Sequence, residues 1–205
     1  MAKCTLYGDS RSGNCYKPAL LMRLTGQSFD WVETNVMSGQ TRSAEFLLLN
    51  ANGKVPLLQY PDGRCLAESN AMLLHLARDT NWFPLDEWQQ ALTWQWLFFE
   101  QYSHEPYIAV ARFIVFFQGR ATSEADRLVV LRERGYQALA VMEKTLQQAP
   151  FLTGDTPTVA DIALYAYTHV ADEGGFDLSS FPAILRWMEC LQLIPGWLKM
   201  SEACR

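Results

Sequence analysis

A loop of short polar residues near the start of the chain has side chains that could stabilise an anion. Residues 8–14 read Gly-Asp-Ser-Arg-Ser-Gly-Asn, after a short apolar segment at 4–7 and before a helical pattern. The first backbone N–H groups of a helix have no partner within the helix, and the helix dipole favours negative charge at that end. Ser12 and Asn14 are therefore candidates for holding a bound thiolate or carboxylate. The same residue types are also common as plain turn and cap residues, so the loop alone leaves both interpretations open.

Two further segments suit a peptide-like ligand. Residues 50–56, Asn-Ala-Asn-Gly-Lys-Val-Pro, lead into a strand, and a cis Val55–Pro56 bond there would leave the Val55 backbone to pair with an extended ligand. Glu68 and Ser69 stand where another helix should begin, beside unpaired N–H groups. A carboxylate and a hydroxyl at that position could contact a ligand, but a helix cap is the simpler interpretation of Ser69.

The elements that must position these segments form an α/β first part with the order βαβαββα. Because Pro18 has no N–H and fits only the first turn of a helix, we expect the first helix to start near Cys15. Residues 61–64, Pro-Asp-Gly-Arg, have the chemistry of a hairpin turn, and Ser43 is placed to cap a short helix. Strands are expected at 4–7, 29–34, 55–60 and 65–66, and further helices at 44–49 and 71–77.

Beyond residue 84 the strand signals almost vanish, which predicts an all-helical second part. We expect a first domain at 1–80, a linker at 81–86 and a helical domain at 87–205. Two of its helix starts carry capping boxes, Ser123-x-x-Asp126 and Thr158-x-x-Asp161. The expected helices run from about 87 to 117 with a bend near Pro106, then over 123–148, 158–170 and 182–191.

Composition narrows the class of protein. The 205 residues carry a net charge of −5, and 49% of them are hydrophobic, which favours a compact globular protein without a broad basic surface for nucleic acid. Residues 1–84 hold 8 Lys and Arg against 7 Asp and Glu, while 85–205 hold 9 against 15, so the acidity belongs to the helical part. The near-neutral first part could accept an anionic small molecule.

Missing patterns exclude several kinds of site and location. The sequence has no signal-peptide pattern and no apolar run long enough for a membrane span. Its five scattered cysteines have no metal-ligand spacing to the three histidines, so we expect a reducing, cytoplasmic compartment and no metal. Motifs of dinucleotide oxidoreductases, P-loop NTPases, zincins and α/β-hydrolases are also absent.

The three segments in this order, followed by a helical part, resemble the cytosolic glutathione S-transferase family, in particular its bacterial, serine-type, theta-like and zeta-like members. Four segments across nearly the whole chain carry the resemblance. They are the active-site loop at 6–15, the N-x-x-G-K-V-P segment at 50–56, the E-S-x-A-I segment at 68–72, and the second-domain capping segment at 154–161. The resemblance implies a thioredoxin-like first domain that binds glutathione, a helical second domain that supplies an electrophile pocket, and a homodimer.

The resemblance also implies roles for individual residues. Ser12 takes the catalytic position, where its hydroxyl would donate to sulfur and favour the thiolate over the thiol. Val55 would pair through its backbone with the cysteinyl part of glutathione, next to cis Pro56. The remaining positions implied by the resemblance are Glu68 and Ser69 at the γ-glutamyl end, Lys54 and Gln40 near the glycine carboxylate, and Tyr107 and Arg112 in the electrophile pocket.

The implied activity is that of a detoxifying glutathione transferase, with glutathione as co-substrate and a small hydrophobic electrophile as its acceptor. A glutathione-dependent disulfide or peroxide reductase, with Asn14 in place of Ser12, and a non-catalytic regulatory protein on the same scaffold are the alternatives. Tyr7 and Cys15 approximate the catalytic positions of other members, but core packing is the simpler interpretation of both. The S-S-C motif of zeta-class isomerases is incomplete, which argues against maleylacetoacetate isomerisation.

Overall fold

The computed structural model describes residues 3–205, which fold into two compact units. The first unit runs up to Thr80 and includes Pro195–Arg205, and the second unit is Asn81–Ile194. The sequence placed 195–205 in the helical domain, whereas the structure packs this segment within the first unit. The physical reason is that helix α9 (Met200–Ala203) packs against helix α1 (Gly13–Leu24).

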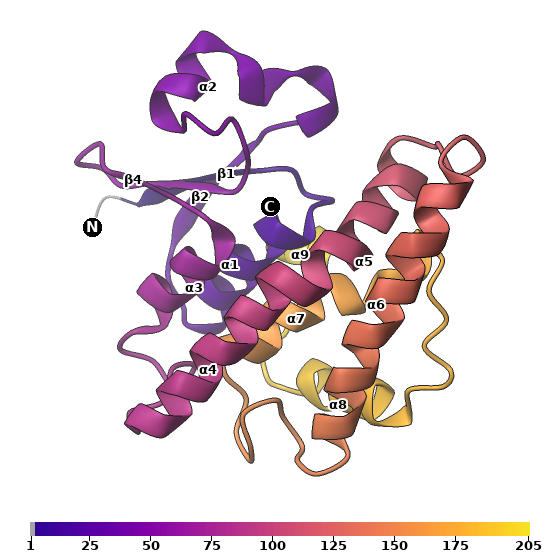
Figure 1. Cartoon of the computed structure of the whole chain (residues 1–205). Helices are drawn as coiled ribbons and strands as arrows, with labels where there is room; N and C mark the ends of the chain where they lie inside the picture. The colour runs from indigo at the N-terminus through magenta and orange to yellow at the C-terminus, as the bar shows by residue number, and fades with distance from the viewer. Residues whose placement is uncertain (1–2) are drawn as a thin grey trace. The chain divides into compact units, whose positions relative to one another are not determined.

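The first unit is a sheet with helices, and the order of its elements confirms the expected α/β class (Figure 1). Its strands are β1 (Cys4–Gly8), β2 (Phe29–Glu33), β3 (Leu57–Gln59) and β4 (Cys65–Ala67). They lie in the order β2-β1-β3-β4, with β1 and β2 parallel and the other pairs antiparallel. Besides α1 and α9, the helices are α2 (Ala44–Leu49), α3 (Ser69–Ala77), and the short 3₁₀ turns η1 (Val36–Ser38) and η2 (Gln40–Arg42).

The core of the first unit lies where α1 and α3 pack against each other and β1 and β3 run side by side. Strand β1 alternates buried and half-buried residues, as a strand with one fully covered face should. The side chains with no exposed surface there include Leu6, Leu20, Leu57 and Leu73. This core fixes the strand ends and helix starts that carry the polar residues of interest.

Three local expectations in the first unit are wrong in detail. Helix α1 begins at Gly13 rather than Cys15, with Ser12 as its N-cap, so Pro18 lies inside the helix. Tertiary packing outweighs the hydrogen bond that Pro18 cannot donate. Ser69 is the first residue of α3 and not its cap, because Glu68 occupies the N-cap position. Strand β3 begins at Leu57, after Pro56.

The second unit consists of helices and the loops between them. Its β-structure, among the described residues, is an isolated bridge between Phe151 and Gly154. The expected helix over 87–117 is divided, because a wide π-helical turn precedes Pro106 and accommodates the missing N–H of proline. The elements are α4 (Glu87–Phe99), η3 (Glu100–His104, π), α5 (Glu105–Arg112), η4 (Phe113–Phe117, π), α6 (Ala125–Leu146), α7 (Val159–Thr168), η5 (Ala171–Gly174, 3₁₀) and α8 (Pro182–Gln192). Within residues 3–205 no helix has both the length and the apolar character that a bilayer span requires.

Buried carboxylates hold the helix starts of the second unit. The Thr158–Asp161 capping box is confirmed, and the Asp161 carboxylate also accepts from the Leu152 N–H at 3.0 Å and from Trp187 Nε1 at 2.9 Å. Glu143 on α6 accepts from the first two N–H groups inside α8, each at 3.0 Å. These contacts join α6, α7 and α8 into one core.

The second expected capping box, at Ser123, does not form. Helix α6 begins at Ala125 with Glu124 as its N-cap, and the Ser123 hydroxyl donates to the Arg120 carbonyl instead. A hydroxyl next to a turn has several backbone partners within reach, and the S-x-x-D pattern does not decide among them.

Candidate functional site

The register of the sheet brings the predicted site segments to one end of it. Gly8 of β1 pairs with Glu33 of β2, Tyr7 pairs with Leu57 of β3, and Leu57 pairs with Ala67 of β4. The loop after β1, the segment before β3 and the residues after β4 therefore leave the sheet at the same end. That end collects Ser12, Val55 and Ser69 although they are far apart in the sequence.

The loop after β1 is held in place by a buried carboxylate, Asp9, which sequence reasoning missed. Its side chain has no exposed surface and accepts from Arg11 Nε at 2.9 Å and Arg11 Nη2 at 2.8 Å. The backbone N–H groups of Arg11 and Val36 also donate to it. Burial raises the pKa of Asp9, but the hydrogen bonds from Arg11 and Val36 outweigh burial, so the pKa lies below its ordinary value of 3.8. Asp-x-Arg in a polar loop was the available sequence signal.

Ser12 stands at the N-terminus of α1 with its hydroxyl available to a ligand. Its backbone is extended, its oxygen accepts from the Cys15 N–H at 3.5 Å, and the residue is half-buried. The Ser12 side chain also forms a hydrogen bond with the Cys15 thiol, which lowers the pKa of that thiol against the larger effect of burial. A hydroxyl rotates freely about its C–O bond, so Ser12 can turn from Cys15 and donate to an anion that also meets the N-terminal N–H groups of α1.

The two neighbouring alternatives to Ser12 are occupied by packing. The Cys15 side chain is fully buried, and burial raises its pKa to about 12, so it stays a thiol at neutral pH. The Tyr7 hydroxyl donates to Gln59 Oε1 at 3.0 Å, and its ring packs edge-on against Phe46 at a centroid distance of 6.2 Å. Neither residue presents its reactive group as Ser12 does.

The loop before β3 is ordered by Asn50. The Asn50 amide donates to the Lys54 carbonyl at 2.8 Å, and its carbonyl oxygen accepts from the Asn52 N–H at 3.1 Å. Gly53 has a φ of +61°, and a Cβ there would lie 2.8 Å from the Thr41 carbonyl oxygen, so the turn needs glycine.

This turn delivers three predicted glutathione contacts. Lys54 is exposed, Val55 is half-buried, and the Val55–Pro56 bond is cis, as the sequence suggested. Gln40, at the start of η2, is also exposed, and its Oε1 accepts from the Asn35 N–H at 2.6 Å.

The start of α3 meets the start of α1 through side chains. The Ser69 hydroxyl is buried and donates to Asn14 Oδ1 at 3.2 Å. Glu68 is exposed and has a φ of +68°, which is uncommon for a residue with a side chain. The ammonium group of Lys17 lies 3.4 Å from Ser69 Oγ and 3.2 Å from Asn70 Oδ1. Asn14 and Ser69 are thus brought together, and Lys17 joins them although no sequence pattern marked it.

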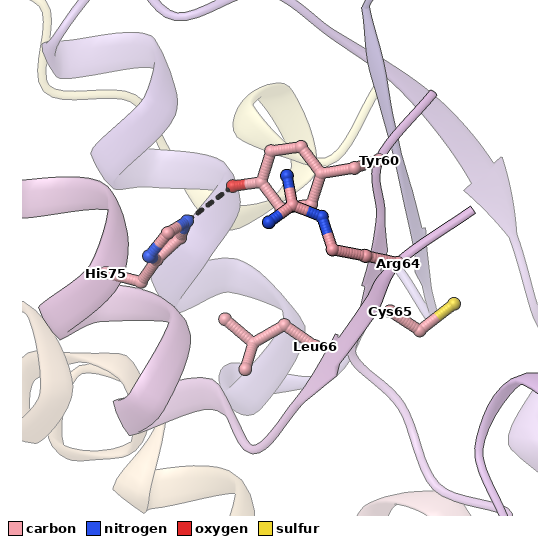
Figure 2. A pocket seen from close by; sticks show the side chains of 5 residues that line it. All are labelled: Tyr60, Arg64, Cys65, Leu66 and His75. Atoms are coloured by element: carbon pink, nitrogen blue, oxygen red, sulfur yellow. Dashed lines mark hydrogen bonds between the residues drawn. The ribbon is translucent and has the colours of Figure 1, made fainter. Parts of the chain in front are cut away.

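A separate cavity of about 230 Å³ lies beside the hairpin of β3 and β4 (Figure 2). Tyr60 and His75 face each other across it, with the Tyr60 hydroxyl 2.8 Å from His75 Nε2, while the Cys65 side chain points away from that pair. The remaining lining residues are Arg64 and Leu66. None of the predicted glutathione contacts lines this cavity.

The two predicted electrophile contacts of the second unit differ in exposure. Tyr107 on α5 is half-buried. The Arg112 side chain is 3% exposed, donates through Nε to Glu173 Oε2 at 2.6 Å, and lies over the rings of Phe116 and Phe117 at 4.9 and 5.4 Å. These contacts place Arg112 in the helical core. Its contact with an electrophile stays a prediction, and the burial of its side chain argues against it.

Over residues 3–205 no group of three or more His, Cys, Asp or Glu side chains is arranged to hold a metal ion.

Comparisons with known proteins agree with the two-unit architecture. Residues 2–78 match the family model of the glutathione S-transferase N-terminal domain, and residues 109–190 match that of the C-terminal domain. The crystal structure of a glutathione S-transferase from Pseudomonas fluorescens Pf-5 is similar with a TM-score of 0.95 and 49% identity, over 97% of this chain and 99% of that one.

More distant relatives differ in length and in kind. The zeta-class glutathione S-transferase of Euphorbia esula is 28% identical over 94% of this chain and 87% of its own length. The transcriptional regulator URE2 of Saccharomyces cerevisiae is 27% identical over 95% of this chain and 66% of its own length. The chain thus spans about two thirds of the length of the URE2 relatives it matches.

Proposed function

The chain belongs to the glutathione S-transferase family, and from this premise we propose that it activates glutathione as a thiolate at Ser12 and transfers it to a hydrophobic electrophile. Both domains of the family are present, and the chain is a glutathione transferase. The observation that carries the proposal is the half-buried Ser12 hydroxyl, placed as the N-cap of α1 beside the N–H groups that begin the helix.

Thiolate formation at this position has a definite energetic size. Lowering a thiol pKa of about 8.5 by about two units corresponds to roughly 2.7 kcal/mol of extra stabilisation of the anion. One hydroxyl donor together with the N-terminal N–H groups of α1 can supply an effect of that size. The buried thiol of Cys15, with a pKa of about 12, does not compete for this role.

The remaining contacts suit the two charged ends of glutathione. Lys54 is an exposed cation and Gln40 an exposed amide, both suited to the glycine carboxylate. Glu68 and Ser69 stand at the start of α3 and suit the γ-glutamyl end, while the Val55 backbone would pair with the cysteinyl part. Tyr107 is the candidate for contact with the electrophile.

The proposal is tested by titrating the thiol of bound glutathione, followed by the ultraviolet absorbance of the thiolate. For Ser12→Ala we expect a higher thiol pKa and a loss in kcat/KM of about 10²- to 10³-fold. Ser10→Ala is the matched control, because it removes a hydroxyl from the same loop, one that bonds to Glu33. An unchanged thiol pKa in Ser12→Ala would refute the role of Ser12.

The reductase alternative is separated by its substrate and by its dependence on Asn14. Turnover of a mixed disulfide, with a larger loss for Asn14→Ala than for Ser12→Ala, would favour reduction over conjugation. The similarity to URE2 keeps a non-catalytic regulatory role in view, and failure of the protein to be retained on immobilised glutathione would favour it.

We also propose a homodimer in a reducing, cytoplasmic compartment that acts in detoxification. An apolar stripe on α4 and η3 supports a partner surface, since Trp94, Phe98 and Tyr102 follow at four-residue spacing and are 43%, 75% and 84% exposed. Light scattering of the protein and of Phe98→Lys checks the dimer, because a charge in a buried interface should produce monomers.

A further inference from the structure

Asp9 is a buried carboxylate whose hydrogen bonds hold the loop that carries Ser12 to the segment after β2. Its Oδ1 accepts from the Arg11 N–H at 3.1 Å and from Arg11 Nε at 2.9 Å. Its Oδ2 accepts from Arg11 Nη2 at 2.8 Å and from the Val36 N–H at 3.2 Å. One carboxylate therefore fixes both the backbone and the side chain of Arg11, the residue next to Ser12.

The backbone of Asp9 contacts Ser12 directly. The Asp9 carbonyl oxygen accepts from the Ser12 N–H at 2.9 Å, which closes a turn over residues 9–12. The Ser12 carbonyl oxygen in turn accepts from the Tyr16 N–H at 3.0 Å, as the N-cap of a helix does. Because the direction of the Ser12 side chain follows from this backbone, a shift of Asp9 moves the Ser12 hydroxyl.

The charge of Asp9, taken alone, opposes a thiolate at this place. Burial is the main cause of the raised pKa of the Cys15 thiol, and the negative charges of Asp9 and Glu33 raise it further. The charged groups around the loop are thus two carboxylates and the guanidinium of Arg11, which pairs with Asp9. Since its charge is unfavourable to a thiolate, the benefit of Asp9 lies in the position that it gives to Ser12.

We infer that Asp9 is a positioning residue for the proposed reaction, because its carboxylate holds the turn that directs the Ser12 hydroxyl at the glutathione sulfur. Its side chain has no exposed surface, so Asp9 acts through Ser12 and has no direct contact with the reacting groups. This inference rests on the proposed function, because Ser12 contacts the thiolate there.

Asp9→Asn separates the effect of position from the effect of charge, with the thiol pKa of bound glutathione as the readout. The asparagine NH2 group would face the donors of Arg11 or Val36, so the turn loses part of its support. We expect the thiol pKa to rise by about one pKa unit and kcat/KM to fall about tenfold, because a misplaced donor loses much of its effect. Removal of a negative charge alone would lower that pKa. A lower or unchanged thiol pKa would therefore overturn the inference.

A double variant shows whether Asp9 acts through Ser12. In the Ser12→Ala background, Asp9→Asn should raise the thiol pKa by less than about 0.3 pKa units, because the hydroxyl that Asp9 positions is gone. A further rise of about one pKa unit, as large as the one expected in the wild-type background, would overturn the inference.

Glu33→Gln is the matched control for the loss of a negative charge beside the same loop. The Glu33 carboxylate accepts from the N–H and the hydroxyl of Ser10, and glutamine keeps an acceptor oxygen for both. We expect an unchanged or slightly lower thiol pKa. A rise as large as that in Asp9→Asn would overturn the specific role of Asp9.

Val36→Pro provides a second variant in case Asp9→Asn does not fold. It keeps every charge of the loop and removes the N–H that donates to Asp9 Oδ2. Val36 is the first residue of η1 and follows Asn35, which is extended, so the backbone accepts proline there. We expect a rise in the thiol pKa with a two- to threefold loss in kcat/KM, roughly the effect of one lost hydrogen bond. An unchanged thiol pKa would overturn the inference.

The results of the two single variants separate this inference from the proposed function. A raised thiol pKa in Ser12→Ala, together with no rise in Asp9→Asn, would overturn the role of Asp9 and leave the transferase intact. An unchanged thiol pKa in Ser12→Ala would overturn the proposed role of Ser12 and this inference with it.

Discussion

Carboxylates of the chain close the starts of α7 and α8 in the second unit, whereas no carboxylate closes the starts of α1 and α3 in the first. In the second unit, Asp161 accepts from the start of α7 and Glu143 from the start of α8, so carboxylates of the chain satisfy both ends. In the first unit, α1 has a single hydroxyl cap, and α3 has no side-chain cap.

The difference shows that the positive end of a helix can serve either stability or ligand binding. A helix start with its own carboxylate is neutralised, and it ties neighbouring helices together. A helix start without one keeps positive potential and unpaired donors, which a ligand with a thiolate and carboxylates can use. At these four helices, side-chain pairing therefore distinguishes two starts that stabilise the helical core from two that are proposed to face glutathione.

The largest expected effect is the removal of the closed end at Asp161. Asp161→Ala leaves three buried donors, the N–H groups of Leu152 and Thr158 and the indole N–H of Trp187, without their acceptor. We expect a loss of about 3–5 kcal/mol in unfolding free energy, measured by urea denaturation with tryptophan fluorescence. Asp155→Ala, in an exposed loop, should change it by less than about 0.5 kcal/mol. A loss below about 1 kcal/mol for Asp161→Ala would contradict the comparison.

A smaller loss is expected when only the charge at α8 is removed. Glu143→Gln keeps one acceptor oxygen but places an amide N–H2 opposite a backbone donor, so unfolding free energy should fall by about 1–3 kcal/mol. The thiol pKa of bound glutathione should not change. Glu133→Gln, on an exposed position of the same helix, is the control. A shift in that thiol pKa would show that the two kinds of helix start are coupled.

The contribution of the buried Asp9 carboxylate to the free energy of unfolding should depend on pH. Because the pKa of Asp9 is lower in the folded protein than its ordinary 3.8, its stabilisation is complete above that value and is lost as pH falls through the folded pKa. The difference in unfolding free energy between wild type and Asp9→Asn should be about 1–2 kcal/mol at neutral pH and shrink below pH 4. Asp79→Asn serves as the exposed control, and a difference independent of pH would refute this role of Asp9.

The smallest stability effects are expected for the two hydroxyl caps. Thr158→Ala should reduce unfolding free energy by about 1 kcal/mol without changing kcat/KM, because its cap is part of a closed box. Ser12→Ala should reduce it by about 0.5 kcal/mol or less, because its cap bond is long at 3.5 Å. Paired thermal unfolding and kinetic assays check the contrast. A greater loss of unfolding free energy in Ser12→Ala than in Thr158→Ala would contradict this expected contrast.

Local patterns predicted most of the architecture and part of the site. The cis bond before Pro56, which the family resemblance implied, is confirmed. Three predictions from local patterns are also confirmed, namely the order of strands and helices in the first unit, the Ser43 cap and the Thr158–Asp161 box. Each depends on residues a few positions apart, where turn, cap and periodicity rules apply directly.

The features that escaped prediction depend on distant residues. Glu143 caps a helix that begins about 40 positions later, and Lys17 meets Ser69 across 52 positions. Arg112 pairs with Glu173 across 61 positions, and no sequence pattern marked that contact either. Such partners are chosen by tertiary packing, which a short window of sequence does not contain.

The segment 195–205 has a consequence for the order in which the protein is assembled. Helix α1 carries Ser12 at its start, and its Tyr16 hydroxyl donates to the Leu198 carbonyl at 2.6 Å. On the ribosome, all of Asn81–Ile194 is made before this segment emerges. The first unit therefore starts to fold early but acquires its last contacts with α1 late, so a nascent chain holding the complete Ser12 loop still lacks the finished scaffold beneath it.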